Sequence, residues 1–304
     1  MSSDRPLLGI MLMLAFCMLA PFGDALAKLL GSVVPLLQIL VTRFAVQALI
    51  LYPLARRHGS PFALPARVLW LTALRTVLHV AGIAAVVIAL RYLPLADAIA
   101  IAFVMPFLML LLGWLVLGEQ VGPRRLAACA VGFAGTLMVV QPSFAEVGAP
   151  ALWPLAVAVI FALFMLVTRS IAKAADPVTL QAVSGVMASV VLFPLIVAAD
   201  AFGWDGLAPA DLSWNQMWLM GAMGVVGTVA HLVMTWSLRF APASTLAPMQ
   251  YLEIPFATLI GWIIFRDLPD GLAAAGILVT IAAGLYVIYR EHKVSRPKVP
   301  GPPV

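Results

Sequence analysis

The stretch LRYLPLADAIAIAFVMPFLMLLLGWLVLGE at residues 90–119 returns as LRFAPASTLAPMQYLEIPFATLIGWIIFRD at residues 238–267. Both copies open on Leu-Arg and a nearby proline, carry Gly-Trp late in an apolar run, and end on an acidic residue. Met105-Pro106-Phe107 falls one residue out of step with Ile254-Pro255-Phe256, and Ala27-Lys28 parallels Ala172-Lys173 earlier in the chain. Such an ordered series of matches indicates an internal repeat.

The composition excludes a water-soluble protein. Of 304 residues, 63% are apolar and 10% are charged, against about 25% charged in a typical soluble domain. Apolar runs of membrane-spanning length recur along the chain, so lipid is the expected solvent. The same numbers exclude a disordered chain, a coiled coil and a disulfide scaffold. Cys17 and Cys129 lie in apolar runs, and we interpret both as small buried hydrophobes.

Cutting the chain at charged and turn-forming clusters predicts an all-α polytopic membrane protein with ten transmembrane helices. The predicted spans are 7–29, 35–55, 68–90, 95–117, 124–141, 151–171, 178–198, 216–238, 243–265 and 271–289. Each repeat then holds five helices, at 7–142 and 150–290. Because five is odd, the second copy must insert upside down, which is an inverted repeat. The basic, proline-rich tail 292–304 is expected to be disordered and cytoplasmic.

The Lys and Arg residues predict that both termini are cytoplasmic. Most of them then lie inside, among them Arg56, Arg57, Arg124 and Arg125, whereas Lys28, Arg91 and Arg266 lie outside. The net charge of +5 is interpreted as this topology signal, and no nucleic-acid partner is expected. A cleaved signal peptide ending near Ala25-Leu26-Ala27 is the alternative for the first span. The counterpart of this span in the second half favours a retained helix.

Four charged residues within the spans are candidates for gating or ion coupling, because charge in hydrocarbon needs a partner, water or a function. Asp24 and Lys28 are four residues apart on one helix face. They form either a neutralising pair or part of an outer gate. Arg43, in the second span, either bridges to another helix or binds an anion. Asp97 lies near the start of the fourth span.

Six further residues are candidates for binding substrate. Arg75 and His79 share a face of the third span, and His231 lies deep in the eighth, where hydrogen-bonded packing is the alternative. Gln250, Tyr251 and Glu253 lie between Pro248 and Pro255. A proline-interrupted helix is tolerated where it lines a cavity, and Pro106 interrupts the matching fourth span.

No catalytic motif is present. The sequence has no H-E-x-x-H, no G-x-S-x-G, no P-loop, no dinucleotide fingerprint and no cysteine–histidine metal spacing. We therefore expect no enzyme, no metal and no cofactor. An intramembrane enzyme would need paired catalytic groups, and a channel would need a ring of like polar groups. Neither pattern is visible.

Three features together are similar to the EamA-type drug/metabolite transporter superfamily. They are the ten spans, the five-plus-five repeat, and the ends of the two quoted copies, Leu117-Gly118-Glu119 and Arg266-Asp267. The second ending departs from the commoner Gly-Glu. Gln250 to Pro255, with Gly23-Asp24 and Ala27-Lys28, resembles a bacterial subgroup of riboflavin and S-adenosylmethionine transporters. The resemblance implies a central cavity formed mainly by spans 1, 3, 4, 6, 8 and 9, which leaves Arg43 outside it.

The sequence thus predicts a multi-pass, secondary-active transporter of the bacterial inner membrane that works by alternating access on a small metabolite. The metabolite is expected to resemble riboflavin, S-adenosylmethionine or an amino acid, with Arg75 facing an anionic or carboxylate group. A drug or metabolite exporter of the same fold is the alternative. The expected partners are the substrate and the lipid bilayer. A homodimer, the substrate, the direction and the coupling ion stay open.

Overall fold

The structure is a computed structural model, and it describes residues 5–57, 59–93, 95–102, 104–140, 149, 152–266 and 271–294. Every regular element within these ranges is helical. The all-α prediction is therefore confirmed for the part of the chain that the structure describes. The helices follow the predicted spans closely, since each predicted span coincides with one helix or with a short run of helices.

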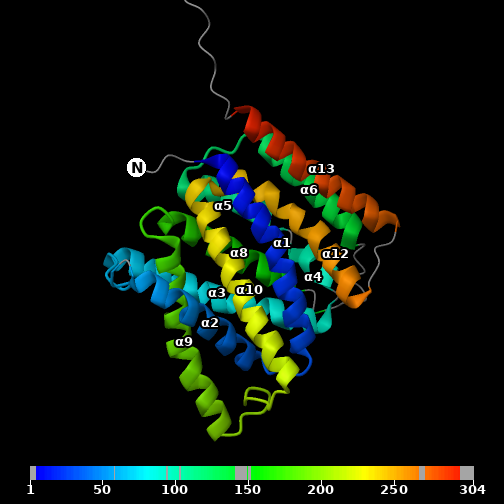
Figure 1. The fold of residues 1–304 in the computed structure, drawn as a ribbon. Coiled ribbons are helices and arrows are strands. Elements are labelled where there is room, and N and C mark those ends of the chain that lie inside the picture. Colours follow the sequence, from blue (N-terminus) through cyan, green and yellow to red (C-terminus); the bar gives the residue numbers. More distant parts are fainter. Residues whose placement is uncertain are drawn as a thin grey trace, which may run out of the picture.

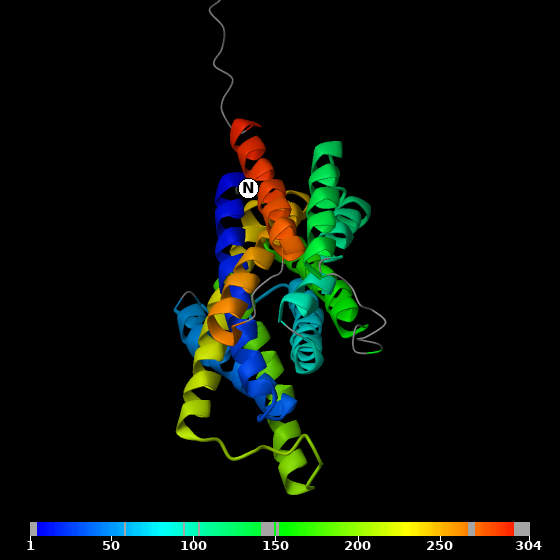
Figure 2. The same cartoon turned by 90° about the vertical axis from the view of Figure 1, so that its right-hand side faces the viewer.

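Six helices are long and apolar enough to cross a membrane. At 1.5 Å per residue, about 20 residues cover the hydrocarbon core of a bilayer. The six are α1 (Pro6–Gly31), α2 (Leu36–Arg56), α3 (Ala66–Tyr92), α8 (Leu152–Ile171), α9 (Pro177–Ala201) and α10 (Trp214–Phe240). Two further helices, α6 (Pro123–Val140) and α13 (Gly271–Val294), lie side by side in both ribbon views (Figures 1 and 2).

The two copies of the quoted stretch form broken helices. The first copy gives α4 (Leu95–Ala102) and α5 (Met105–Leu117). The second gives α11 (Ala243–Leu246), the 3-10 helix η2 (Ala247–Leu252) and α12 (Glu253–Phe265). Prolines stand near each break, because proline lacks the amide that a continuous helix needs.

The two copies also end alike. α5 stops at Gly118 and α12 stops at Arg266, both with left-handed backbone at a φ of 63°. The Arg266-Asp267 ending therefore keeps the backbone geometry of the Gly-Glu ending, although arginine adopts this conformation less readily than glycine. Asp267 itself lies outside the described residues.

The helix packing is symmetric between the two halves of the chain. α1 packs along α10, and α3, the counterpart of α10, packs along α8, the counterpart of α1. The remaining extensive pairs join counterparts directly, α2 with α9 and α6 with α13. Elements from the two halves therefore interleave across the molecule (Figures 1 and 2).

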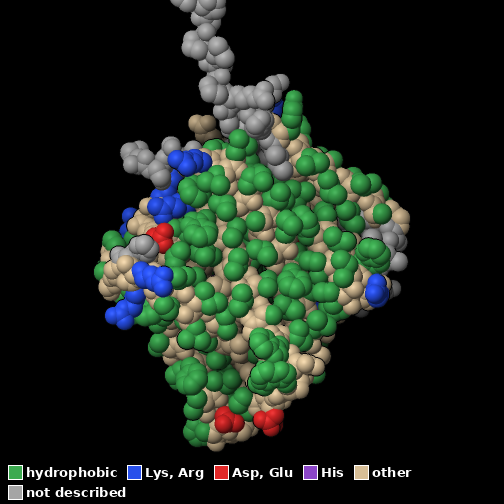
Figure 3. Space-filling model, viewed as in Figure 1, with side chains coloured by type: hydrophobic (Ala, Val, Ile, Leu, Met, Phe, Trp, Pro, Cys, Tyr) green, Lys and Arg blue, Asp and Glu red, His purple; other side chains and the backbone are tan. Residues whose placement is uncertain are grey.

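The surface suits lipid. Large apolar side chains such as Leu49, Trp70 and Val190 are exposed to 74%, 74% and 67%. Patches of this extent are rare on soluble monomers. Figure 3 shows hydrophobic side chains over the middle of one face, most of the visible Lys and Arg along the left-hand edge below the start of α1, one at the right-hand edge, and acidic side chains where α9 ends.

Candidate functional site

A central cavity of about 90 Å³ lies where the broken helices meet the long ones. It is lined from α1, α3, α4, α5, α8, α10 and α12. These elements correspond to predicted spans 1, 3, 4, 6, 8 and 9. Three of its described lining residues carry polar side chains, Asp24, His231 and Glu253, and the aromatic walls are Phe16 and Phe161. The volume is well below the roughly 300–1,000 Å³ of typical small-molecule pockets, so binding of a whole metabolite requires the helices to move apart.

Glu253 faces this cavity from the break in the second copy. It is the first residue of α12, directly after η2, and its side chain is 9% exposed. Among the described residues, no hydrogen bond or ion pair reaches its carboxylate. Acidic groups are favoured at a helix N-terminus, which explains how the fold holds Glu253 there without a side-chain partner.

Arg43 reaches the cavity wall from α2. Its Nη2 atom lies 3.0 Å from His231 Nδ1. The same Nδ1 atom lies 3.1 Å from the Gly227 carbonyl oxygen, so it faces both a donor and an acceptor, and the Nε2 atom has no partner in the described structure. Gly227, one turn before His231, makes room, since a Cβ there would overlap the Arg43 guanidinium. Arg43 thus bridges α2 to α10, one of the two roles expected of it, and it does not itself line the central cavity.

Asp24 links two cavities. It lines the central cavity and also a smaller one of about 40 Å³, which Arg43 and His231 line as well. The smaller cavity lies between α1, α2, α3 and α10. The carboxylate of Asp24 therefore has a cation on one side and the central cavity on the other.

His79 lies in a stack of rings behind the cavity. Its ring centroid is 4.3 Å from that of His231 and 4.7 Å from that of Phe164, both at tilted angles, and Phe44 meets it edge-on at 5.0 Å. The side chain is fully buried, and neither ring nitrogen has a hydrogen-bond partner in the described structure. His79 does not line the central cavity.

Arg75 is held by hydroxyl groups instead of facing the cavity. Its Nε donates to Thr168 (2.8 Å), Nη1 to Ser184 (2.8 Å) and Nη2 to Thr235 (3.2 Å). These hydroxyls come from α8, α9 and α10, and the guanidinium stacks on Phe164 at 4.7 Å. The side chain is 0% exposed. In this conformation Arg75 joins four helices and contacts no open volume.

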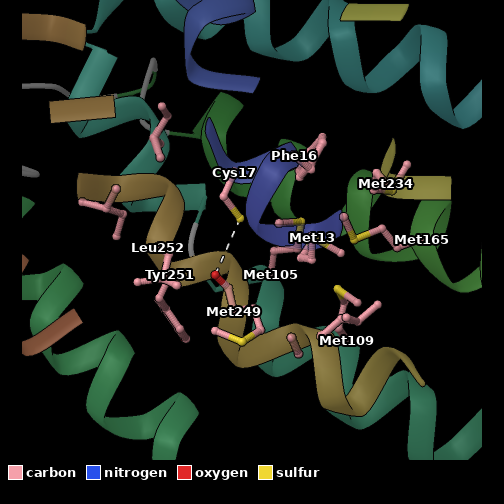
Figure 4. Close-up of a cluster of buried hydrophobic side chains, with 14 of the residues drawn as sticks. Met13, Phe16, Cys17, Met105, Met109, Met165, Met234, Met249, Tyr251 and Leu252 are labelled. Atoms are coloured by element: carbon pink, nitrogen blue, oxygen red, sulfur yellow. Dashed lines mark hydrogen bonds between the residues drawn. The ribbon is translucent and has the colours of Figure 1, made fainter. Parts of the chain in front are cut away.

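Gln250 and Tyr251 do not line the central cavity either. The Gln250 Nε2 atom lies 3.0 Å from the sulfur atoms of Met109 and Met165. Tyr251 packs on α6, where a Cβ at Gly132 would stand 2.5 Å from its ring. Figure 4 shows the surrounding methionines, and Cys17 donates to the Met249 carbonyl of η2 at 3.6 Å. The break in the helix frees this carbonyl, and the buried thiol partly satisfies it.

The end of the molecule where α1 stops is hollow. A larger cavity there, of about 670 Å³, is lined by Lys28 and Arg91 among others. It shares Leu90 with the central cavity and Ala27 with the smaller one. Lys28 donates to the Leu93 carbonyl at 3.3 Å and lies over the Phe265 ring. Asp97 belongs to α4, but its side chain lies outside the described residues.

At the opposite end, where α1 begins, an ion pair and several hydrogen bonds hold the helices together. Glu119 pairs with Arg169 of α8 at 3.3 Å and accepts the amides of Ala243 and Ser244 in α11. Arg169 also donates to the Leu238 carbonyl at 2.6 Å. These contacts tie the end of the first copy to the start of the second copy.

Phe16, Phe161 and Arg169 carry no sequence motif that would mark them as site residues. Phenylalanine in an apolar span carries no signal that separates a cavity wall from a lipid-facing surface. Arg169, at the end of an apolar span, fits the basic topology signal equally well. The Leu-Gly-Glu ending of the first copy was the available clue, because an acidic residue beside a helix start needs a donor or a cation.

The fold and surface define a polytopic membrane protein with a central cavity. The chain belongs to the EamA-like transporter family, whose model matches residues 7–141 and 149–290. It is therefore a transporter and not an enzyme, and the resemblance seen in the sequence is confirmed.

Three relatives with named substrates match over most of their length. A riboflavin transporter of Rhizobium johnstonii is 30% identical over 75% of this chain and 72% of its own. An S-adenosylmethionine uptake transporter of Rickettsia bellii is 23% identical over 91% of this chain and 92% of its own. The pseudopaline exporter CntI of Pseudomonas aeruginosa PAO1 is 28% identical over 85% and 88%. A crystal structure at 18% identity superposes with a TM-score of 0.69 over 96% of this chain and 98% of that one, which shows the fold.

Proposed function

We propose that this protein is a secondary-active transporter of a small metabolite in the bacterial inner membrane and works by alternating access. The observation that carries the proposal is the central cavity, which receives lining residues from both halves at the breaks in the two repeated stretches. Discontinuous helices at the interface of two repeats are where transporters of this kind hold substrate.

The proposed architecture is ten transmembrane helices in two inverted five-helix repeats, 7–142 and 150–290, with both termini cytoplasmic. The symmetric packing of α1 with α10 and of α3 with α8 supports a twofold relation between the halves. Most of the visible Lys and Arg lie along the edge below the start of α1, and acidic groups lie at the far end, which supports the orientation (Figure 3).

In this orientation the described conformation is closed to the cytoplasm. Glu119 and Arg169 hold α8 and α11 together on that side. The 670 Å³ hollow faces the periplasm and meets the central cavity at Leu90. Transport would proceed when the cytoplasmic contacts break and the walls around Leu90 close. The sequence carries no P-loop, so an ion gradient, substrate exchange or the substrate gradient itself would drive the cycle.

The relatives define the candidate substrates. Riboflavin and S-adenosylmethionine are those of the transporters matched here, and uptake of one of them is our first expectation. The similarity to the pseudopaline exporter favours metabolite export as the second candidate function.

Uptake into proteoliposomes tests the proposal. We expect labelled riboflavin or S-adenosylmethionine to accumulate with the purified full chain and not with empty vesicles. His231→Ala should reduce the rate by about tenfold or more, because it removes a wall of the cavity and the partner of Arg43. Asp200→Asn, at an exposed position near the end of α9, is the control. No uptake or counterflow of any candidate by folded protein would contradict transport.

Reporter fusions test the orientation separately. A fusion at Gly59 should report the cytoplasm, and one at Gly203 should report the periplasm. The reverse result at both positions would invert the proposed orientation without affecting the site.

A further inference from the structure

The charged side chains that line the central cavity are both acidic, and the guanidinium of the adjoining smaller cavity does not balance them; Lys28 and Arg91 line the larger hollow instead. Asp24 and Glu253 line the central cavity, and Arg43 lines the smaller one beside Asp24. His231 is the remaining titratable lining residue of both cavities, and the Arg43 guanidinium 3.0 Å from its ring disfavours a charged imidazole. Two carboxylates therefore face one guanidinium, with Glu253 left over.

Arg75 does not correct this imbalance. All three of its guanidinium nitrogens donate to hydroxyls of α8, α9 and α10, and it lines neither cavity. The anionic group that the sequence assigned to Arg75 would find no free cation in the central cavity. The charge of the described lining favours the opposite sign.

The walls of the cavity are suited to an organic cation. Phe16 and Phe161 line it and flank His231, with ring centroids 5.8 Å and 6.2 Å from the imidazole. Aromatic faces attract ammonium and sulfonium groups that have lost their hydration shell. The aliphatic remainder of the lining favours a cation with apolar substituents over a metal ion.

Two buried polar groups point to a ligand. Glu253 is 9% exposed and lacks a partner among the described residues, and the Nε2 atom of the 5% exposed His231 is also unpartnered. An uncompensated carboxylate in an apolar wall is costly unless a cation or a proton reaches it. The imidazole Nε2 atom can donate to or accept from a polar atom of the same ligand, according to its tautomer.

We propose that the central cavity binds the permanently charged centre of an organic cation, a sulfonium or a quaternary ammonium, against Glu253 between Phe16, Phe161 and His231. The proposal rests on the transporter function above and specifies its substrate class.

S-adenosylmethionine and S-adenosylhomocysteine form a matched pair for the test, because they differ by one methyl group and one positive charge. We expect the purified full chain to bind the sulfonium compound at least about tenfold more tightly, as a charge-assisted contact contributes roughly tenfold to a hundredfold in affinity. Glu253→Gln should abolish this ratio, whereas the exposed-site control Asp200→Asn should keep it. The ratio also excludes general damage, because a misfolded variant loses both ligands alike.

A second pair, 1-methylnicotinamide and nicotinamide, repeats the comparison on a smaller scaffold. The proposal is overturned if the neutral member of each pair binds as well as the cation, if the preference survives Glu253→Gln, or if folded protein binds neither cation. Uptake of riboflavin without any cation preference would reject the cation site and leave transport intact. Cation binding that depends on Glu253, without uptake or counterflow, would reject transport and keep the site.

Discussion

Arg75 and Glu253 are both buried charged residues in the membrane-spanning part of the molecule, but they differ in their hydrogen-bond partners. Arg75 has a hydroxyl on each guanidinium nitrogen, supplied by three other helices. Glu253 has no described partner and faces a cavity. Arg43 is intermediate, with one nitrogen on His231 and Nη1 unpartnered. A satisfied buried charge stabilises helix packing, whereas an unsatisfied one facing a cavity marks the place for a ligand.

Arg75→Ala should give the largest loss of stability. It removes three interhelical hydrogen bonds, each worth about 0.6 to 1.7 kcal/mol in membrane proteins, while Thr168 and Thr235 keep their bonds to backbone carbonyls. We expect the free energy of unfolding to fall by about 2–5 kcal/mol, measured by denaturant titration in detergent.

Arg67→Ala is the matched control for this change, since Arg67 lies on the same helix and is exposed. We expect the affinity of the folded fraction for substrate to change far less than its stability. Equal unfolding midpoints for the two variants would mean that the hydroxyl cluster contributes nothing to the fold.

Gly227→Ala should give the next largest loss of stability, because it disturbs Arg43, the charge that is only partly satisfied. The new Cβ would overlap the Arg43 guanidinium, and overpacking of this kind costs about 1–3 kcal/mol. Displacement of Arg43 also removes the donor to His231. Gly221→Ala on the same helix is the control, because a Cβ there meets nothing within 4 Å. If both variants unfold alike, Arg43 can move aside and the contact with His231 is dispensable.

The sequence predicted the helices well because lipid imposes length and apolarity on every span. The prolines at Pro106, Pro248 and Pro255 also placed both breaks correctly. The orientation of side chains around each helix could not be predicted. A span that faces lipid on one side and protein on the other is apolar all round, so periodicity does not separate Phe161 from an outward-facing residue.

The same limit explains why the sequence selected candidate site residues but could not assign their roles. Residue type alone selected Arg75, Glu253 and His231, but it could not separate a charge that holds helices together from one that faces a cavity. That difference depends on partners far apart in sequence, such as Thr168 and Thr235 around Arg75. Whether Gln250 and Tyr251 reach substrate in another conformation stays a prediction.

Glu253→Gln should have a smaller effect on stability, and one of opposite sign. Removing an unpaired buried charge raises the free energy of unfolding. Losing a favourable charge at the helix start lowers it by about 0.3–1 kcal/mol. We expect unfolding free energy to be unchanged or about 1 kcal/mol higher, while substrate uptake falls. A loss of stability as large as that of Arg75→Ala would place Glu253 among the structural charges.

His79→Phe should have the smallest effect of the four. Both imidazole nitrogens lack described partners, so the phenyl ring forfeits no hydrogen bond and keeps the stack between Phe164 and His231. We expect stability to stay within about 1 kcal/mol of wild type, as for other volume-conserving changes in a core, and uptake to be near normal. His231→Phe is the contrasting variant, because it loses the Arg43 contact and a wall of the cavity. If His79→Phe keeps its stability but loses uptake about tenfold, then the nitrogens of His79 contact substrate in another conformation. His79 would then join Glu253 on the functional side of the comparison, and missing partners, more than cavity lining, would mark the substrate site.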